Sequence, residues 1–202
     1  MKSTTQKYPI SILASIVALL TFLMLATRGN HFTVFNDLPS ASTAVFFLAG
    51  MYLRSIKSFW YFYILSIVID LSSSYMRGSF GDCLTASYPA LAFSYAAMFA
   101  IGFYAKASWN QQSALFNIAK ISIALFTASA IAFFISNGSY YALSGHFYPL
   151  SWAEYTARVD KYFVSSISRP IFYVASAIAI DYVISQFFSH KTSAATQPSE
   201  HL

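Results

Sequence analysis

Long apolar stretches, close to the length that crosses a lipid bilayer, constrain this sequence most. The first of them runs from Tyr8 to Thr27 without a charged side chain, and Arg28 follows it directly. The hydrocarbon core of a bilayer is about 30 Å thick, and a helix needs about 20 apolar residues to cross it. Only 9% of the 202 residues are charged, against roughly 25% in soluble domains. The pattern predicts an integral membrane protein.

The rest of the chain divides into further apolar segments joined by short polar connections. The prediction is an all-α membrane protein with six transmembrane helices, a single domain over residues 1–190 and a disordered polar tail over 191–202. The longest loop, 136–168, is rich in aromatic side chains and starts with a turn at Asn137-Gly138; part of it, around 152–164, could form a short interfacial helix. The six helices are expected at residues 8–27, 41–53, 59–75, 89–106, 115–135 and 170–188.

The basic residues near the helix ends predict the orientation in the membrane. With the N-terminus inside, seven Lys and Arg residues fall on the cytoplasmic side and five on the other. This small excess favours cytoplasmic placement of both termini. The three chemically rich loops then face the periplasm of a bacterium. The single cysteine excludes an internal disulfide framework.

One connecting segment, from Asp70 to Pro89, contains the only cysteine, Cys83. Asp70 follows an apolar run, and a carboxylate at membrane depth is costly unless it is paired, so Asp70 is a candidate functional residue. If the helix ended at Val68, Asp70 would instead be a solvated cap. Cys83 precedes a predicted helix, whose N-terminus favours the thiolate, a soft ligand and a nucleophile. A lone cysteine in a membrane protein is otherwise a small apolar filler.

Three further residues fall on the same predicted side of the membrane. His31 is a metal-ligand or hydrogen-bond candidate, or an ordinary loop histidine. Tyr88, next to Pro89, is a site residue or a member of the aromatic belt at the membrane interface. Arg158 is a ligand-binding cation, a solvated loop charge or an anchor at the membrane surface. Each of these signals is weak when it is taken alone.

The candidate residues together form the pattern Asp70-(x)12-Cys83-(x)4-Tyr88, with His31 upstream and Arg158 in the last long loop. With six expected helices and 202 residues, the chain resembles the substrate-binding S-components of energy-coupling-factor (ECF) vitamin transporters. Within that group it is most similar to the BtuM family, predicted cobalamin transporters of Gram-negative bacteria. The resemblance extends from the first expected helix to the last.

The resemblance implies an S-component-like bundle in the bacterial inner membrane that binds cobalamin (vitamin B12) in a periplasm-facing pocket. Cys83 would be an axial ligand to cobalt, and His31, Asp70, Tyr88 and Arg158 would line the pocket. A thiolate on cobalt weakens or displaces the ligand on the opposite face. Cys83 is therefore also the candidate catalytic residue for removing cyanide from cyanocobalamin.

The expected partners are cobalamin and membrane lipid. Nucleic acid is not expected, because the basic residues behind the net charge of +5 are scattered and mostly flank apolar runs. S-components of this type work with a coupling protein and ATPases, which would dock at the small pair Ala14 and Ala18 on the first helix; otherwise this pair packs inside the bundle, and the protein acts alone. The chain itself lacks a phosphate-binding glycine loop.

Two other classes of function compete with transport. A membrane oxidoreductase or haem protein would use His31 or Cys83 as an axial ligand, but the other candidate histidine, His146, is predicted in a loop rather than on a facing helix. A structural or assembly protein would have Cys83 only as filler.

Overall fold

The computed structural model describes residues 9–28, 40–78, 85–107 and 114–194, and this part of the chain contains helices and no strand. The prediction of an all-α protein is therefore confirmed. The elements are α1 (Ile10–Arg28), α2 (Ser42–Leu48), the π-helical segment η1 (Ala49–Leu53), α3 (Ile56–Arg77), α5 (Ala90–Ala107), α6 (Ala114–Leu143) and α7 (Trp152–Ala194).

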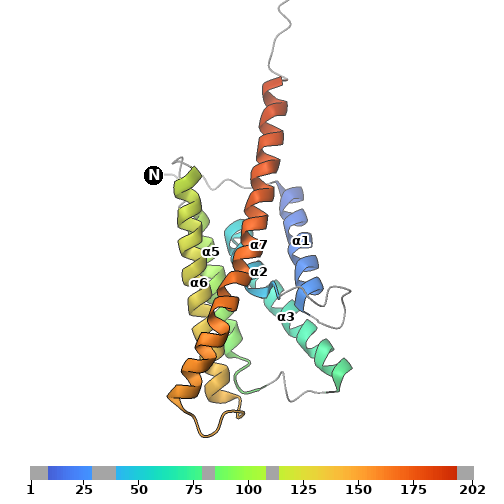
Figure 1. Ribbon diagram of the computed structural model, residues 1–202. Helices are drawn as coiled ribbons and strands as arrows, with labels where there is room; N and C mark the ends of the chain where they lie inside the picture. Colours follow the sequence, from blue (N-terminus) through green and yellow to red (C-terminus); the bar gives the residue numbers. More distant parts are fainter. Residues whose placement is uncertain (1–8, 29–39, 79–84, 108–113, 195–202) are drawn as a thin grey trace, which may run out of the picture.

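The helices alternate in direction along the bundle (Figure 1). α1, α3 and α6 run from the upper end of the view to the lower end, whereas α2, α5 and α7 run upward. The start of α1 and the end of α7 therefore lie toward the upper end, and the connection from α6 to α7 lies at the lower end. This arrangement brings the last residue of α1 close to α2 and α3.

Length and composition allow a membrane crossing for three of the described helical stretches, Ile10–Arg28, Leu115–Leu143 and Trp152–Val183. Two shorter apolar stretches, Ser42–Leu53 and Ala90–Ala105, lie between them in the chain. Large apolar side chains are exposed along the outside of the bundle, for example Phe22 and Trp60. Such a surface is suited to lipid contact and unusual for a soluble monomer.

The central element of the bundle is α2 with its continuation η1. Phe46, Phe47 and Met51 are fully buried there, and the ring of Phe46 stacks on that of Tyr95 from α5 at a centroid distance of 4.3 Å. Arg54 ends η1 in a left-handed conformation with φ of 49°. Its guanidinium carbon lies 4.2 Å from the centroid of the Phe103 ring on α5.

Two glycines allow the backbone of α5 to touch those of η1 and α2. A Cβ atom on Gly50 would lie 2.1 Å from the carbonyl oxygen of Phe99, and one on Gly102 would lie 2.2 Å from that of Phe47. No side chain fits at such distances, so the contact requires glycine at both positions. This contact fixes α5 against the centre of the bundle.

The predicted long loop over residues 136–168 is wrong. α6 continues to Leu143 and α7 begins at Trp152, so the connection covers only residues 144–151. The Asn137-Gly138 pair lies inside α6 because packing outweighs its turn propensity. Asn137 is buried, and Gly138 faces the hydroxyl of Tyr155, which would lie 3.4 Å from an added Cβ.

The expected start of the last helix at Pro170 is wrong for a related reason. Proline is favoured in a first helical turn, but here it is fully buried inside α7, which begins at Trp152. The expected helix around 152–164 exists as the first part of α7 rather than as a separate interfacial element. α7 also continues to Ala194, past the expected domain limit at residue 190.

The expected small pair on α1, Ala14 and Ala18, is exposed. The interpretation that this pair packs inside the bundle is therefore wrong for this chain. The buried face of α1 is formed instead by Leu20, Met24 and Thr27, toward its C-terminal end.

Candidate functional site

Arg28 and Asp70 form a two-pronged ion pair between α1 and α3. The Nε atom of Arg28 donates to Oδ1 of Asp70 at 2.7 Å, and Nη2 donates to Oδ2 at 2.7 Å. The side chains are 9% and 19% exposed, respectively. Parallel hydrogen bonds between guanidinium and carboxylate fix the orientation of both groups. Because α3 continues to Arg77, Asp70 is not the solvated helix cap that the sequence left open.

Tyr88 adds a neutral donor to the same carboxylate. It lies in the turn before α5, and its hydroxyl donates to Oδ2 of Asp70 at 2.8 Å. Burial and, after it, the negative charge of Asp70 raise the pKa of Tyr88 well above its ordinary value. Both effects disfavour the phenolate. Tyr88 therefore remains a hydrogen-bond donor through the physiological pH range.

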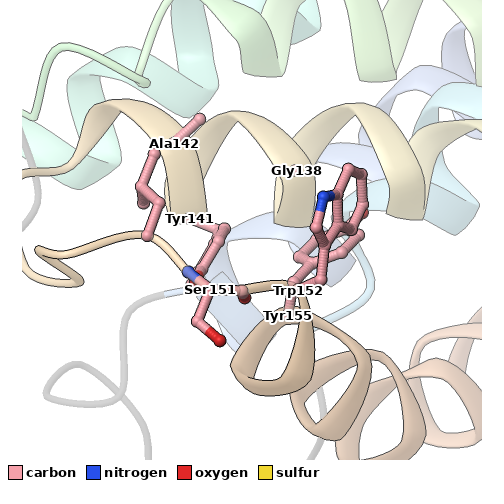
Figure 2. Close-up of a pocket in the computed structure, with 7 residues that line it drawn as sticks. Gly138, Tyr141, Ala142, Ser151, Trp152 and Tyr155 are labelled. Carbon is pink, nitrogen blue, oxygen red and sulfur yellow. The ribbon is translucent and has the colours of Figure 1, made fainter.

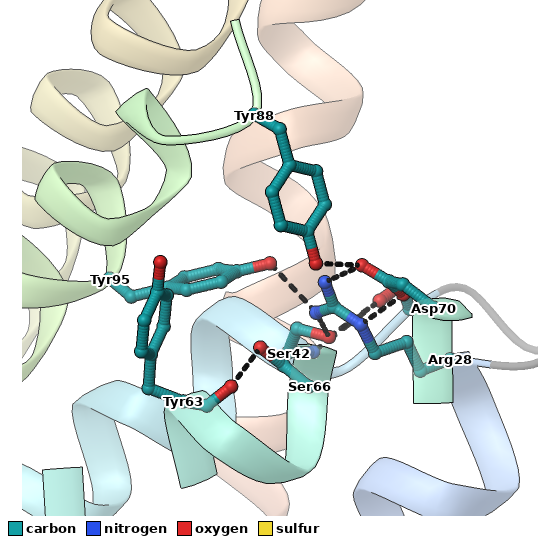
Figure 3. Close-up of polar contacts among 8 residues, drawn as sticks. Arg28, Ser42, Tyr63, Ser66, Asp70, Tyr88 and Tyr95 are labelled. Carbon is teal, nitrogen blue, oxygen red and sulfur yellow. Dashed lines mark hydrogen bonds and ion pairs between the residues drawn. The ribbon is translucent and has the colours of Figure 1, made fainter. Parts of the chain in front are cut away.

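The remaining arm of the Arg28 guanidinium points to α2 and α5. Its Nη1 atom donates to the hydroxyl of Ser42 at 2.7 Å and to that of Tyr95 at 2.7 Å. Arg28 thus contacts three other elements from the end of α1 (Figure 3). We call Arg28, Ser42, Asp70, Tyr88 and Tyr95 the polar cluster.

Local bonds hold α1 in position to place Arg28. The hydroxyl of Thr27 donates to the carbonyl of Leu23 at 2.9 Å and accepts the backbone N–H of Ala41 at 3.0 Å. The second bond ties the end of α1 to the start of α2. Thr27 is buried, so the tie is shielded from water, and it sets the register in which Arg28 meets Ser42.

The polar cluster contains two of the expected site residues, Asp70 and Tyr88. His31 and Cys83 lie outside the described residues. No sequence pattern predicted Arg28, Ser42 or Tyr95 as site residues. A signal for Arg28 was present, because it ends the first apolar stretch and its charge is opposite to that of Asp70.

Arg158 lies on α7, apart from the polar cluster. Its guanidinium carbon is 4.3 Å from the ring centroid of Phe147, 5.6 Å from that of Tyr140 and 5.4 Å from that of Tyr162. Its Nε atom is buried and has no hydrogen-bond partner among the described residues. Arg158 is therefore an aromatic-enclosed cation rather than a solvated loop charge.

A cavity of about 440 Å³ lies next to this aromatic group, at the turn between α6 and α7 (Figure 2). Tyr141 and Ser151 close the turn: the Ser151 N–H donates to the Tyr141 hydroxyl at 2.6 Å, and that hydroxyl donates to the Ser151 carbonyl at 2.8 Å. Trp152 and Tyr155 form part of the wall. The aromatic residues expected in a loop thus line a cavity on two helix ends.

The described residues contain no group of three or more His, Cys, Asp and Glu side chains that could hold a metal ion. His146, the second histidine of the haem alternative, lies between α6 and α7 with its ring 6.1 Å from that of Tyr140. The corrin ring of cobalamin supplies four nitrogen ligands to cobalt, so the protein needs to provide only one axial ligand. A cobalamin site therefore does not require three metal-ligating side chains.

A scan against protein-family models and a search of curated proteins each find no match to this chain. The resemblance to S-components therefore stays a prediction from the residues that carry it.

Proposed function

We propose that this chain is a cobalamin-binding membrane protein for vitamin uptake, with the binding site at the end of the bundle that holds the polar cluster. The observation that carries the proposal is the hydrogen bond from Tyr88 to Asp70 at 2.8 Å. It joins two of the five residues of the expected site, although 18 positions separate them in the chain.

Chain connectivity supports the same location for the other two ligand candidates. An extended chain covers at most about 3.6 Å per residue. His31 follows Arg28 by three positions, and Cys83 precedes Tyr88 by five. Both residues are therefore tethered within about 20 Å of the polar cluster.

Cobalt chemistry explains why a single cysteine suffices. The corrin supplies four equatorial nitrogens, so the protein needs to provide only one axial ligand. A thiolate is a soft donor suited to such a position, and coordination holds it deprotonated. When the Cys83 thiolate binds cobalt of cyanocobalamin, cyanide leaves as the anion by ligand exchange, with no change in oxidation state. This step is the proposed decyanation.

Arg158 and its aromatic neighbours would contact a different part of the ligand. The guanidinium lies against the rings of Tyr140, Phe147 and Tyr162, and its Nη groups can donate to an amide or phosphate oxygen. Aromatic walls cover a large flat ring at little cost in side-chain entropy.

The membrane setting of the proposal is a six-crossing bundle in the bacterial inner membrane, with both termini in the cytoplasm and the site toward the periplasm. The common end of the start of α1 and the end of α7 supports this topology. The exposed pair Ala14 and Ala18 offers a place for a coupling protein with its ATPases to dock. The alternative is that the chain takes up cobalamin without a coupling protein.

The direct test is the absorbance spectrum of cyanocobalamin mixed with the purified protein in detergent. We expect a spectral shift with the wild type and none with Cys83→Ala, while Ser87→Ala, which changes another small side chain before α5, behaves as the wild type. An identical shift in Cys83→Ala would refute axial ligation. A haem Soret band in the purified protein would support the haem alternative instead.

Growth tests the transport part separately. A cobalamin-dependent strain that lacks its own importer should grow on low cobalamin when it expresses the wild-type chain and not when it expresses Cys83→Ala. Failure of the wild type to restore growth, with the protein present in the membrane, would count against uptake by the chain alone. Co-expression of a coupling protein and its ATPases then tests whether uptake depends on them.

A further inference from the structure

The hydrogen bonds of the polar cluster leave one acceptor position of the Asp70 carboxylate unused. A carboxylate offers about four acceptor positions. Oδ1 of Asp70 receives one hydrogen bond, from Nε of Arg28, whereas Oδ2 receives two, from Nη2 of Arg28 and from the hydroxyl of Tyr88. No other group among the described residues donates to Asp70. Oδ1 can therefore accept one more hydrogen bond from a ligand.

Tyr88 adds a second acceptor beside the first. Its hydroxyl uses its hydrogen in the bond to Asp70, and it receives no hydrogen bond from any described residue. A hydroxyl oxygen has two lone pairs that can accept. Because the Tyr88 hydroxyl lies 2.8 Å from Oδ2 of Asp70, the two acceptors are neighbours (Figure 3).

The two members of the ion pair differ in how far a ligand can reach them. The side chain of Asp70 is 19% exposed, and that of Arg28 is 9% exposed. Four of the five N–H groups of the guanidinium already donate within the cluster, to Asp70, Ser42 and Tyr95. The cluster therefore presents hydrogen-bond acceptors to a ligand more than it presents donors.

The charges of the pair favour a neutral ligand group. Because Arg28 and Asp70 compensate each other, an ammonium group would bring an uncompensated charge into a partly buried site. A carboxylate would place further acceptors against those of Asp70 and Tyr88. A primary amide brings two N–H donors and no charge. Primary amides surround the corrin ring of cobalamin, so the ligand of the proposed function has the matching group.

We propose that the polar cluster is a subsite for one primary amide of the corrin periphery. Asp70 and Tyr88 accept its N–H groups, and Arg28 is a positioning residue that holds the Asp70 carboxylate in its orientation through two parallel hydrogen bonds. The subsite rests on the proposed cobalamin binding and adds a specificity to it. It selects a corrin with an intact amide over one that has a carboxylate in the same place.

The test compares cyanocobalamin with its monocarboxylic acids, in each of which one peripheral amide is hydrolysed to a carboxylate. Absorbance titration of the purified wild type in detergent at pH 7 measures the affinity for each compound. The acid that lacks the recognised amide should bind about tenfold more weakly than cyanocobalamin, because its carboxylate faces the acceptors of the cluster. Equal affinities for all the acids and for cyanocobalamin would overturn the subsite and leave the proposed function standing. If the wild type binds no cyanocobalamin, both fail.

Asp70→Asn connects this preference to the polar cluster. Asparagine can turn its own NH₂ group toward a carboxylate, so the variant should lose most of the preference for cyanocobalamin over the weakly bound acid. The matched control is Asp181→Asn on α7, which removes another carboxylate that accepts a tyrosine hydroxyl, that of Tyr52 at 3.2 Å. The control should keep the wild-type preference. A full preference in folded Asp70→Asn would overturn the proposal.

Arg28→Lys tests the positioning role. Lysine keeps the positive charge but cannot make two parallel hydrogen bonds to a carboxylate. The Asp70 carboxylate should then be held less firmly, and the preference should shrink severalfold, while the spectral shift at saturating cyanocobalamin stays as in the wild type. A loss of stability with an unchanged preference would overturn the positioning role.

Should Asp70→Asn fail to fold because Arg28 loses its counter-charge, a double variant takes its place. Arg28→Gln combined with Asp70→Asn leaves neither charge unpaired. The double variant should bind cyanocobalamin and the weakly bound acid with similar affinities. A tenfold preference that persists in the double variant would show that the recognised amide lies elsewhere and would overturn the proposal.

Discussion

The guanidinium of Arg28 and the carboxylate of Asp70 meet edge to edge, with two hydrogen bonds of 2.7 Å each. They join the C-terminal end of α1 to α3 across 42 positions of sequence. The remaining donor of Arg28 ties the pair to α2 and α5. The side chain of Arg28 therefore links four helices at the end of the bundle where the proposed vitamin site lies.

Breaking the pair from one side should be more harmful than replacing both partners. Arg28→Met leaves the carboxylate of Asp70 without its cation in a mostly buried position, which should cost about 3 kcal/mol of unfolding free energy. The double variant Arg28→Met with Asp70→Leu should cost less than the sum of the two single variants. Chemical unfolding in detergent of all four proteins measures this coupling. Additive losses would show that the two side chains contribute independently.

Gly50 and Gly102 should not tolerate even a methyl group. A Cβ at either position would lie 2.1–2.2 Å from a backbone carbonyl oxygen of the facing helix, and separating the helices should cost about 3 kcal/mol or more. The matched control is Gly138→Ala in α6, where the nearest atom is 3.4 Å away. That variant should be neutral or stabilising by about 1 kcal/mol, because alanine favours the helix. Melting temperatures that fell equally in the three variants would contradict the close contact.

The hydroxyl of Tyr88 should make stability depend on alkaline pH. Because the folded state raises the pKa of Tyr88, its contribution is fully present below the unfolded value of about 10 and is lost as the pH rises above it. Tyr88→Phe should lower stability by about 1 kcal/mol at pH 7 and should flatten this part of the alkaline loss. Unfolding curves between neutral and alkaline pH measure both effects. Tyr104→Phe, at an exposed position, should leave the profile unchanged.

Arg158 should affect the affinity of the proposed site without affecting its cobalt chemistry. Arg158→Gln removes the cation held between Phe147 and Tyr162, and cobalamin binding should weaken about tenfold, the effect of one lost charge-assisted hydrogen bond. The spectral shift at saturating ligand should remain, because it reports on Cys83. Calorimetric titration and absorbance together check this separation. Loss of the shift itself at saturation would place Arg158 in the cobalt site.

Much of the helix pattern was accessible from the sequence, because lipid-facing and buried segments are both apolar over helical lengths. The predicted stretches 8–27, 41–53 and 89–106 lie within two residues of α1, α2 with η1, and α5. The exceptions are Asn137-Gly138 and Pro170, where residues that usually end helices lie inside them. Local propensity is worth about 1 kcal/mol for glycine and about 3 kcal/mol for proline in a helix interior, and packing against neighbouring helices outweighs it here.

The candidate site likewise has one residue that the sequence indicates and several that it does not. A carboxylate next to an apolar run is improbable without a role, so Asp70 was identifiable from its sequence neighbours alone. Its partners were not, since Arg28, Tyr95 and Ser42 come from three different helices and no local pattern states which helices meet. The same holds for Gly50 and Gly102. Hydropathy is a property of each segment and can be read along the chain, whereas contacts between segments depend on packing geometry that exists only after the bundle has assembled.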